Sequence, residues 1–351
     1  MSSLAEKDTI VVFIHKTVRA YLIDKGLVKI DPILEGNVLG RSHWSILELC
    51  LKVFEFSGSD ELVVPEAAQE ENDNWSFQHY VRCFWMKHGR EGDAYIPLDF
   101  DFPRAILQCK GKGGKLINST KASNEEEMFL LLAAEGCGQL TLKHAEKCRS
   151  VRSCFQAVGA VDDTSTQPQI FDRALFQAII NDRLQTVQRF RRHGVHKFNP
   201  NQIVANSSAI YKACYLGQHE IVQELLDIGA NIAQPIKGRY KTALHAAAAC
   251  NLGRVIDVIF SHPRTSTDSL LELRANISIV GRGATALHIA VAANSTNAAK
   301  VLLEHIDRSS LRETYHVLKT EDGKTAADIA NIIAATGKNT DMKELLEEYL
   351  D

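Results

Sequence analysis

Thr242-Ala243-Leu244-His245-Ala246-Ala247 is the stretch that decides the fold, and it recurs as Thr285-Ala286-Leu287-His288-Ile289-Ala290. Three weaker copies align with it on their first alanine, at 173–178, 208–213 and 325–330. The aligned alanines are 35, 34, 43 and 40 residues apart. Self-similarity at a period of about 20–50 residues is typical of repeat architectures, so we expect the second half of the chain to be an array.

Each copy is followed by a second apolar pattern. In the second repeat this pattern is Ile221, Val222, Leu225 and Leu226, and Gly229 follows it. Spacings of three and four residues place side chains on one face of a helix, and glycine is favoured where a helix ends in a left-handed residue. Every repeat therefore predicts two helices, the first with small alanines and the second with larger apolar side chains.

These units resemble ankyrin repeats, whose signature is T-P-L-H-x-A-A-x-x-G followed by an I-V-x-x-L-L helix and G-A. His245 and His288 match the signature histidine, which in that family is structural and bonds the adjacent finger. Alanine replaces the signature proline throughout, and Asp328 replaces the histidine in the fifth repeat. Asn251 and Asn294 stand where the glycine between the two helices is expected.

The resemblance implies a mainly α protein with an ankyrin-repeat α-solenoid of at least five units over 168–351. The extra residues near 261–268 and 305–320 are expected to lengthen connections, because insertions in repeat arrays map to loops. A helix is expected over 125–136, so 123–167 is interpreted as a possible degenerate repeat and linker. An irregular helical region is expected over 1–122.

The resemblance also implies a non-enzymatic scaffold or adaptor that binds a protein partner on its concave surface and fingers. The family's variable positions map to nine partner-binding candidates: Ile180, Asn181, Tyr215, Leu216, Arg239, Lys241, Arg282, Glu321 and Lys324. Tyr215, Arg239 and Arg282 lead this set because Tyr and Arg most often anchor interfaces. Positions 237, 239, 241 and 282 are basic, which indicates an acidic partner surface. The alternative is that these residues are merely solvated tips.

Three motifs in the first half resemble the segment that follows the NTPase domain in fungal NACHT–ankyrin proteins, which are STAND-type signalling NTPases. The matching residues are Phe13, His15, Thr17, Val18, Tyr21 and Leu22, then His43, Leu47, Cys50 and Leu51, then Phe77, Tyr80, Trp85 and His88. The NTPase itself would precede Thr9. Two further functions stay open: a truncated regulatory remnant that pairs with full-length relatives through 9–90, and an accessory factor with an unrecognised pocket in 1–160.

Motifs that would carry chemistry are weak. The glycine-rich run at 111–116 has Cys109 and Leu116 where a phosphate loop needs Gly and Ser or Thr, so we predict no cofactor. A zinc set is disfavoured for want of close-spaced ligand pairs, and it would comprise Cys137, His144, Cys148 and Cys154. We interpret the carboxylates at 99 and 101 as part of a solvated loop. We interpret the basic run 189–193 as a solvated helix face, and the aromatic run 75–85 as core packing. We predict no catalytic and no metal-binding residue.

Composition is ordinary for a globular chain of 351 residues, with 45% hydrophobic and 24% charged residues. The net charge of −3 lacks the basic footprint of a general nucleic-acid binder. Eight cysteines are too sparse for a disulfide scaffold, and no signal peptide or membrane span is recognised. We therefore expect an intracellular monomer, cytoplasmic or nuclear, that binds neither membrane nor nucleic acid.

Overall fold

A computed structural model describes residues 38–56, 85–97, 100, 125–147, 170–194, 199–237, 240–277, 280–315, 317–335 and 341–350. The chain divides into two compact units, an N-terminal unit of 1–161 and a C-terminal unit of 162–351, and each is described by itself. Helices dominate both units, and the short strands form two separate hairpins within the described ranges.

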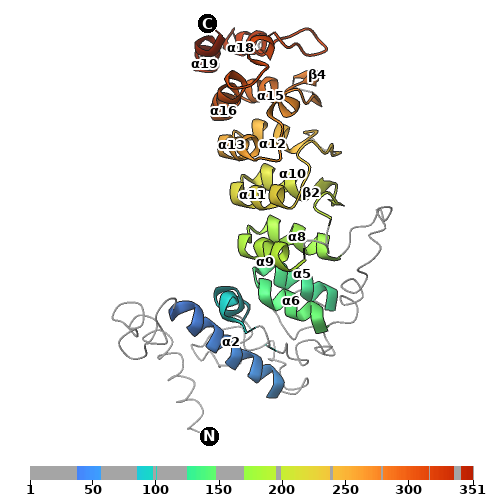
Figure 1. Ribbon diagram of the computed structural model, residues 1–351, viewed down its shortest axis with the longest axis vertical. Helices are drawn as coiled ribbons and strands as arrows, with labels where there is room; N and C mark the ends of the chain where they lie inside the picture. Colours follow the sequence, from blue (N-terminus) through green and yellow to red (C-terminus); the bar gives the residue numbers. More distant parts are fainter. Residues whose placement is uncertain are drawn as a thin grey trace, which may run out of the picture. The chain divides into compact units, whose positions relative to one another are not determined.

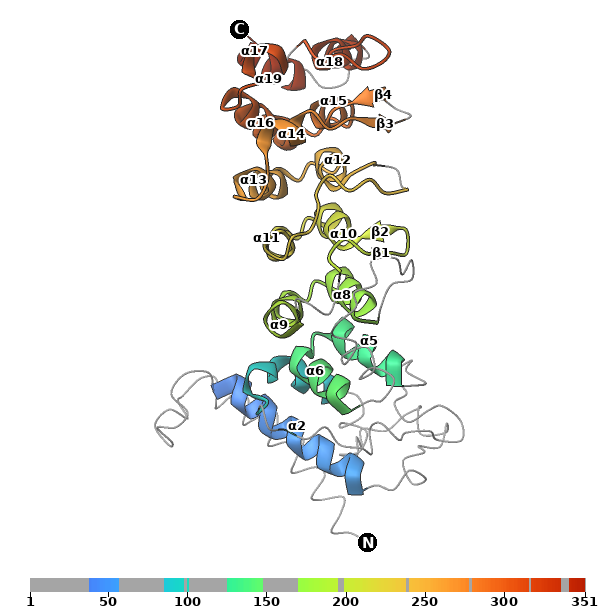
Figure 2. The ribbon, with the colours of Figure 1, turned by 45° about the vertical axis from the view of Figure 1, so that its right-hand side comes forward.

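The C-terminal unit is a stack of helix pairs, drawn from green to red in Figure 1. The inner helices are α8 (Ile170–Ile180), α10 (Ala209–Leu216), α12 (Ala243–Ala249), α15 (Ala286–Ala292) and α18 (Ala326–Ala335). The outer helices are α9 (Leu184–Gly194), α11 (His219–Asp227), α13 (Gly253–Ser261), α16 (Thr296–Asp307) and α19 (Asp341–Leu350). Figures 1 and 2 both show the two sets as separate columns. The predicted α-solenoid is confirmed, and four inner helices begin at the aligned alanine.

Hairpins project from the inner-helix side of the stack (Figure 2). In the second repeat β1 (Ile203–Val204) pairs antiparallel with β2 (Ser207–Ser208). In the fourth, β3 (Ala275–Ile277) pairs antiparallel with β4 (Gly281–Ala284). These are the fingers that the repeat signature predicts. They place exposed side chains beside the N-terminal ends of the inner helices.

One turn geometry joins the two helices of successive repeats. Asp182, Gly217, Asn251 and Asn294 all have a left-handed backbone, with φ between 55° and 78°. In the third repeat the Leu252 N–H then donates to the Ala247 carbonyl at 3.1 Å, as in a Schellman motif. Asparagine tolerates this backbone. The Oδ1 of Asn251 also accepts the Ala298 N–H of the next repeat at 3.0 Å, so asparagine links neighbouring repeats in a way that glycine does not.

The core of the C-terminal unit follows the two predicted patterns. On α12 the alanines at 243, 246, 247 and 248 are at most 1% exposed, so neighbouring inner helices approach closely. Larger side chains fill the space between outer helices, as Val255, Ile256 and Ile259 do on α13. On the terminal helix α19, Met342 and Leu346 are buried while its charged side chains are exposed. That polar face is the cap that a repeat array needs at its end.

The two lengthened connections contain short helices, α14 (Thr267–Leu271) and α17 (Arg312–Tyr315). The hydroxyl of Tyr315 donates to the Leu271 carbonyl at 3.0 Å, and the Ser310 hydroxyl donates to the Asp268 carboxylate. Burial raises the pKa of Tyr315 to about 12. The insertions therefore support one another along one edge of the stack.

The N-terminal unit contains α2 (Val38–Phe56), a helix over 85–91, η4 (Asp93–Tyr95), α5 (Glu125–Glu135) and α6 (Gly138–Lys147). Its hydrophobic core combines residues from the segments 47–51, 85–96 and 128–140: Leu47, Cys50, Leu51, Trp85, Ile96, Met128, Leu132, Cys137 and Leu140. The Nδ1 atoms of His43 and His88 lie 2.7 Å apart. The described residues of the second and third N-terminal motifs thus pack together, which explains them as structural residues.

The helix predicted over 125–136 is present as α5, and its connection to α6 repeats the turn of the C-terminal unit. Gly136 has φ 88°, and the Cys137 N–H donates to the Leu132 carbonyl at 2.9 Å. The interpretation of 123–167 as a degenerate repeat and linker, like the domain boundaries, stays a prediction.

Several predictions concern residues outside the described ranges. They are the first N-terminal motif at 9–22, the aromatic residues from 75 to 84, the carboxylates at 99 and 101, the run 111–116, Cys148, Cys154 and Arg239. Among the helices that are described, none is long and apolar enough to cross a membrane.

Candidate functional site

Eight of the nine predicted partner-binding residues lie in the described ranges, and all eight are exposed. Ile180, Tyr215 and Leu216 stand out because they are large and apolar yet 41%, 46% and 41% exposed. Exposed apolar side chains that gather on one surface mark interaction sites more often than scattered ones do. These three end α8 and α10, which are neighbouring inner helices, so they belong to one surface.

The inter-helix turn places this surface. Ile180 and Asn181 directly precede the left-handed Asp182, and Tyr215 and Leu216 directly precede the left-handed Gly217. In repeats three and four the equivalent positions, 249–250 and 292–293, are occupied by the small residues alanine and cysteine. The fifth repeat has Ile332 and Ile333 at these positions, and Ile332 is 51% exposed. Large apolar side chains therefore occur at this edge in the first two repeats and again in the fifth.

Two residues that the sequence argument missed, Tyr211 and Lys212, lie beside Tyr215, and the Tyr240 backbone contacts Tyr211. We call the four together the tyrosine patch: Tyr211, Lys212, Tyr215 and Tyr240. The Tyr211 and Tyr215 rings are parallel within 4°, with centroids 6.5 Å apart. The Lys212 ammonium lies 5.7 Å from the Tyr215 centroid. Burial raises the pKa of Tyr211, and a hydrogen bond from the Tyr240 backbone opposes that shift. The signal for Tyr211 was its four-residue spacing from Tyr215 on one helix.

The fingers beside this patch are basic. Lys237, Lys241 and Arg282 are exposed, and α10, α12 and α15 contain no acidic residue. One predicted position needs correction, because Arg282 lies within strand β4 and not at a finger tip. Its carbonyl accepts the Glu321 N–H of the next finger at 2.8 Å, which fixes the Arg282 backbone while its side chain stays exposed. Sequence alone placed the finger but not the register of its strands.

The last finger carries the remaining candidates, Glu321 and Lys324. It packs on the fourth finger, since a Cβ at Gly281 would clash with a carboxylate oxygen of Asp322. Gly281 also has φ 100°, so a larger residue there is disfavoured twice. The acidic Glu321 and Asp322 mean that the basic surface ends at the fourth repeat.

His245 has the structural role that the resemblance implies. Its Nδ1 lies 2.8 Å from the Thr242 hydroxyl, and its Nε2 lies 3.2 Å from the Leu273 carbonyl, just before the next finger. His288 repeats both contacts, at 2.8 Å to Thr285 and 3.1 Å to the Leu318 carbonyl. Burial lowers the pKa of His245 to about 4, so this imidazole is neutral near pH 7.

Asp328 keeps half of this arrangement in the fifth repeat. Its carboxylate accepts from the Thr325 N–H at 2.9 Å and from the Thr325 hydroxyl at 2.8 Å. These bonds lower the pKa of Asp328. They cap the start of α18, as the pair of Thr285 and His288 forms a capping box at the start of α15. No described finger follows α18, so the contact that Nε2 makes in the earlier repeats has no counterpart there.

The weak chemical motifs have structural explanations. The Cys137 thiol donates to the Met86 carbonyl at 3.2 Å, and burial lowers the pKa of His144 to about 4. No group of three or more His, Cys, Asp or Glu within the described ranges is placed to hold a metal ion. In the basic run, Arg191 pairs with Glu224 at 2.6 Å and with Asp227 at 2.8 Å, which joins α9 to α11.

Comparison with known families identifies the repeats. A family model for ankyrin repeats in three copies matches residues 175–269, and a model for a single ankyrin repeat matches 282–311. The C-terminal unit carries ankyrin repeats. Such repeats are generally protein–protein interaction modules and typically lack enzymatic activity. No curated protein matches the chain. Neither matched segment reaches the N-terminal unit, so the resemblance of that unit to NACHT–ankyrin proteins is unsupported by these matches.

Proposed function

We propose that this protein is a scaffold or adaptor that binds one protein partner on the inner-helix and finger face of its ankyrin repeats. The observation that carries the proposal is the exposure of Ile180, Tyr215 and Leu216 on neighbouring inner helices. Truncating an interface anchor typically costs about 2 kcal/mol or more, and tyrosine is enriched among such anchors. Tyr215 is accordingly the first residue to test.

The charge of the fingers supports an acidic partner surface. Lys212 belongs to the tyrosine patch, Lys237 and Lys241 lie close to Tyr240 in the chain, and Arg282 lies in the fourth finger. The inner helices α10, α12 and α15 offer no competing carboxylate. Complementary charge raises the association rate more than the affinity, and it does so less at high ionic strength. Binding should therefore weaken as salt is added, chiefly through slower association.

The test is affinity purification of the tagged full-length chain with quantitative mass spectrometry. The surface variant is Tyr215→Ala/Leu216→Ala/Lys241→Ala, and its matched control removes three exposed side chains from the outer helices: Gln223→Ala/Arg254→Ala/Lys300→Ala. Circular dichroism checks that both variants keep the wild-type helix content and melting temperature.

We expect a partner that wild type and the outer-helix control both retain and that the surface variant loses. Equal capture by all three chains would reject this surface. It would move the interaction to the N-terminal unit, as the regulatory-remnant alternative requires. That alternative has less support, because the described residues of its second and third motifs are explained by core packing.

A further inference from the structure

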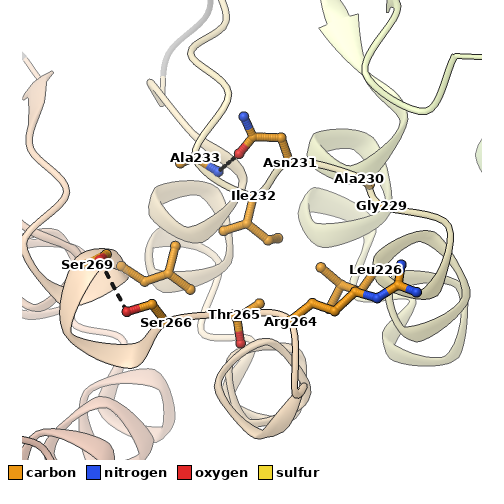
Figure 3. A pocket seen from close by; sticks show the side chains of 11 residues that line it. Leu226, Gly229, Ala230, Asn231, Ile232, Ala233, Arg264, Thr265, Ser266 and Ser269 are labelled. Carbon is orange, nitrogen blue, oxygen red and sulfur yellow. Dashed lines mark hydrogen bonds between the residues drawn. The ribbon is translucent and has the colours of Figure 1, made fainter.

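A pocket of about 250 Å³ lies on the C-terminal unit where the outer helices of the second and third repeats lead into their connections. Leu226, Ile232 and Leu270 supply its apolar lining. Figure 3 shows the Arg264 nitrogens beside Leu226, with Ser266 and Ser269 on the opposite side of Ile232. The pocket is separate from the tyrosine patch, since it is lined by the loops that follow α11 and α13.

The insertion of the third repeat builds one wall of this pocket. Thr265, Ser266, Ser269 and Leu270 all belong to the lengthened connection and its helix α14. The second insertion holds α14 in place, through the hydrogen bond from Tyr315 to the Leu271 carbonyl. A repeat of regular length would lack this wall, so the pocket depends on the insertion.

Arg264 gives the pocket its charge. Its guanidinium donates to the Asp227 backbone carbonyl at 2.6 Å, and no described carboxylate lies within ion-pair distance of it. The nearby Asp227 carboxylate is already engaged by Arg191 at 2.8 Å and by His262 at 3.2 Å. A guanidinium has five donors in a planar fork that suits a carboxylate. Arg264 is exposed and can therefore pair with an acidic group from outside.

The volume of the pocket limits the size of the group that can bind in it. Pockets for small-molecule ligands and cofactors usually measure about 300–1,000 Å³, so this one is too small for a nucleotide-sized ligand. An apolar side chain fits the lining made by Leu226, Ile232 and Leu270. Because Arg264 itself lines the pocket, the carboxylate of an Asp or Glu next to that side chain can pair with its guanidinium.

We propose that this pocket is a second binding site, which takes an apolar side chain of a protein segment that carries an adjacent Asp or Glu. The apolar side chain displaces water from the pocket, and the carboxylate pairs with the Arg264 guanidinium. The site does not depend on the tyrosine patch, so loss of either surface leaves the other intact.

The experiment selects a displayed library of random peptides of about 12 residues on the full-length chain. Selected peptides are then synthesised, and their dissociation constants are measured by fluorescence anisotropy on four variants. Arg264→Glu reverses the charge, and Ser269→Trp fills the pocket. Arg254→Glu makes the same charge change on an exposed position of α13 outside the lining, and Tyr215→Ala tests the other surface.

We expect a class of peptides with an apolar residue next to Asp or Glu, whose binding weakens at least tenfold on Arg264→Glu and on Ser269→Trp. The same peptides should change less than twofold on Arg254→Glu and on Tyr215→Ala. Replacing their acidic residue by its amide should also weaken binding, but by less than Arg264→Glu, because the amide removes the attraction without adding repulsion. Melting curves must show Arg264→Glu and Ser269→Trp folded as wild type.

Three results would overturn the proposal. The first is a selection in which no peptide depends on Arg264. The second is a dependent class that lacks an acidic residue, and the third is binding that survives Ser269→Trp. Peptides lost on Tyr215→Ala but kept on Arg264→Glu would support the tyrosine patch and count against this pocket.

Discussion

Removing the imidazole of His245 should destabilise the third repeat in a pH-dependent way. The ring is fully buried and bonds Thr242 on one side and the Leu273 carbonyl on the other. His245→Ala leaves that carbonyl without its partner, which costs about 1–3 kcal/mol, and it leaves a cavity besides. We expect a total loss of about 3 kcal/mol at pH 7.5.

The sign of the pH effect follows from the lowered pKa. The unfolded chain protonates this histidine below its ordinary pKa of 6.5, while the folded chain keeps it neutral down to about pH 4. The unfolded state therefore binds more protons in this window, and the unfolding free energy falls as the pH falls. At about 1.4 kcal/mol per pH unit, wild type loses about 2 kcal/mol through this group between pH 6.5 and 5.

The difference between wild type and His245→Ala should therefore shrink by about 2 kcal/mol between pH 7.5 and pH 5. Urea unfolding of the full-length chain measures the free energies, and hydrogen exchange of α12 peptides localises the effect. Thr242→Val is the control, because it removes one hydrogen bond and keeps the titrating ring. Parallel curves for wild type and His245→Ala over this range would refute a neutral, buried His245.

Substitutions at three positions test the contacts between neighbouring repeats. Asn251→Gly should lower the free energy of unfolding by about 1 kcal/mol, because the hydrogen bond to the Ala298 N–H is lost. Asn251→Ala should lower it by about 1 kcal/mol more, because alanine must hold φ 59°. Equal urea midpoints for the two variants would contradict this. Gly253→Ala should cost about 1–3 kcal/mol, since its Cβ would lie 2.6 Å from the Asn297 side chain, and an unchanged melting temperature would show that the neighbour moves freely. Arg191→Ala should cost at most about 1 kcal/mol, because its ion pairs to α11 are partly exposed, and about 0.5 M salt should erase the difference.

The repeat fold was predictable because its signals are local and recur in register. The aligned alanines marked where α10, α12, α15 and α18 begin. Their small side chains allow neighbouring inner helices to pack closely. Asn251 and Asn294 were recognisable as replacements for glycine because asparagine tolerates a left-handed backbone. The histidine at 245 and at 288 shared the repeat period, which pointed to a structural role before any contact was known.

The parts that sequence could not supply depend on contacts between distant segments. The insertions were expected only as longer connections, and nothing in 261–268 or 305–320 indicated that Tyr315 would support α14 and so complete a pocket. The Tyr211 ring, which stacks beside Tyr215, contacts the Tyr240 backbone, and Tyr240 comes from the next repeat. In the N-terminal unit, Leu47 and Trp85 meet across 38 residues, a pairing that carries no periodic signal.

Hydrogen exchange of the full-length chain, with and without the captured partner, tests the central claim most directly. Binding on the inner-helix and finger face predicts slower exchange in peptides covering α10, α12 and the finger at 236–241. Peptides from α11 and α13 should stay unchanged. Protection confined to the N-terminal unit, with no change at 207–216 or 236–249, would contradict the proposed binding surface.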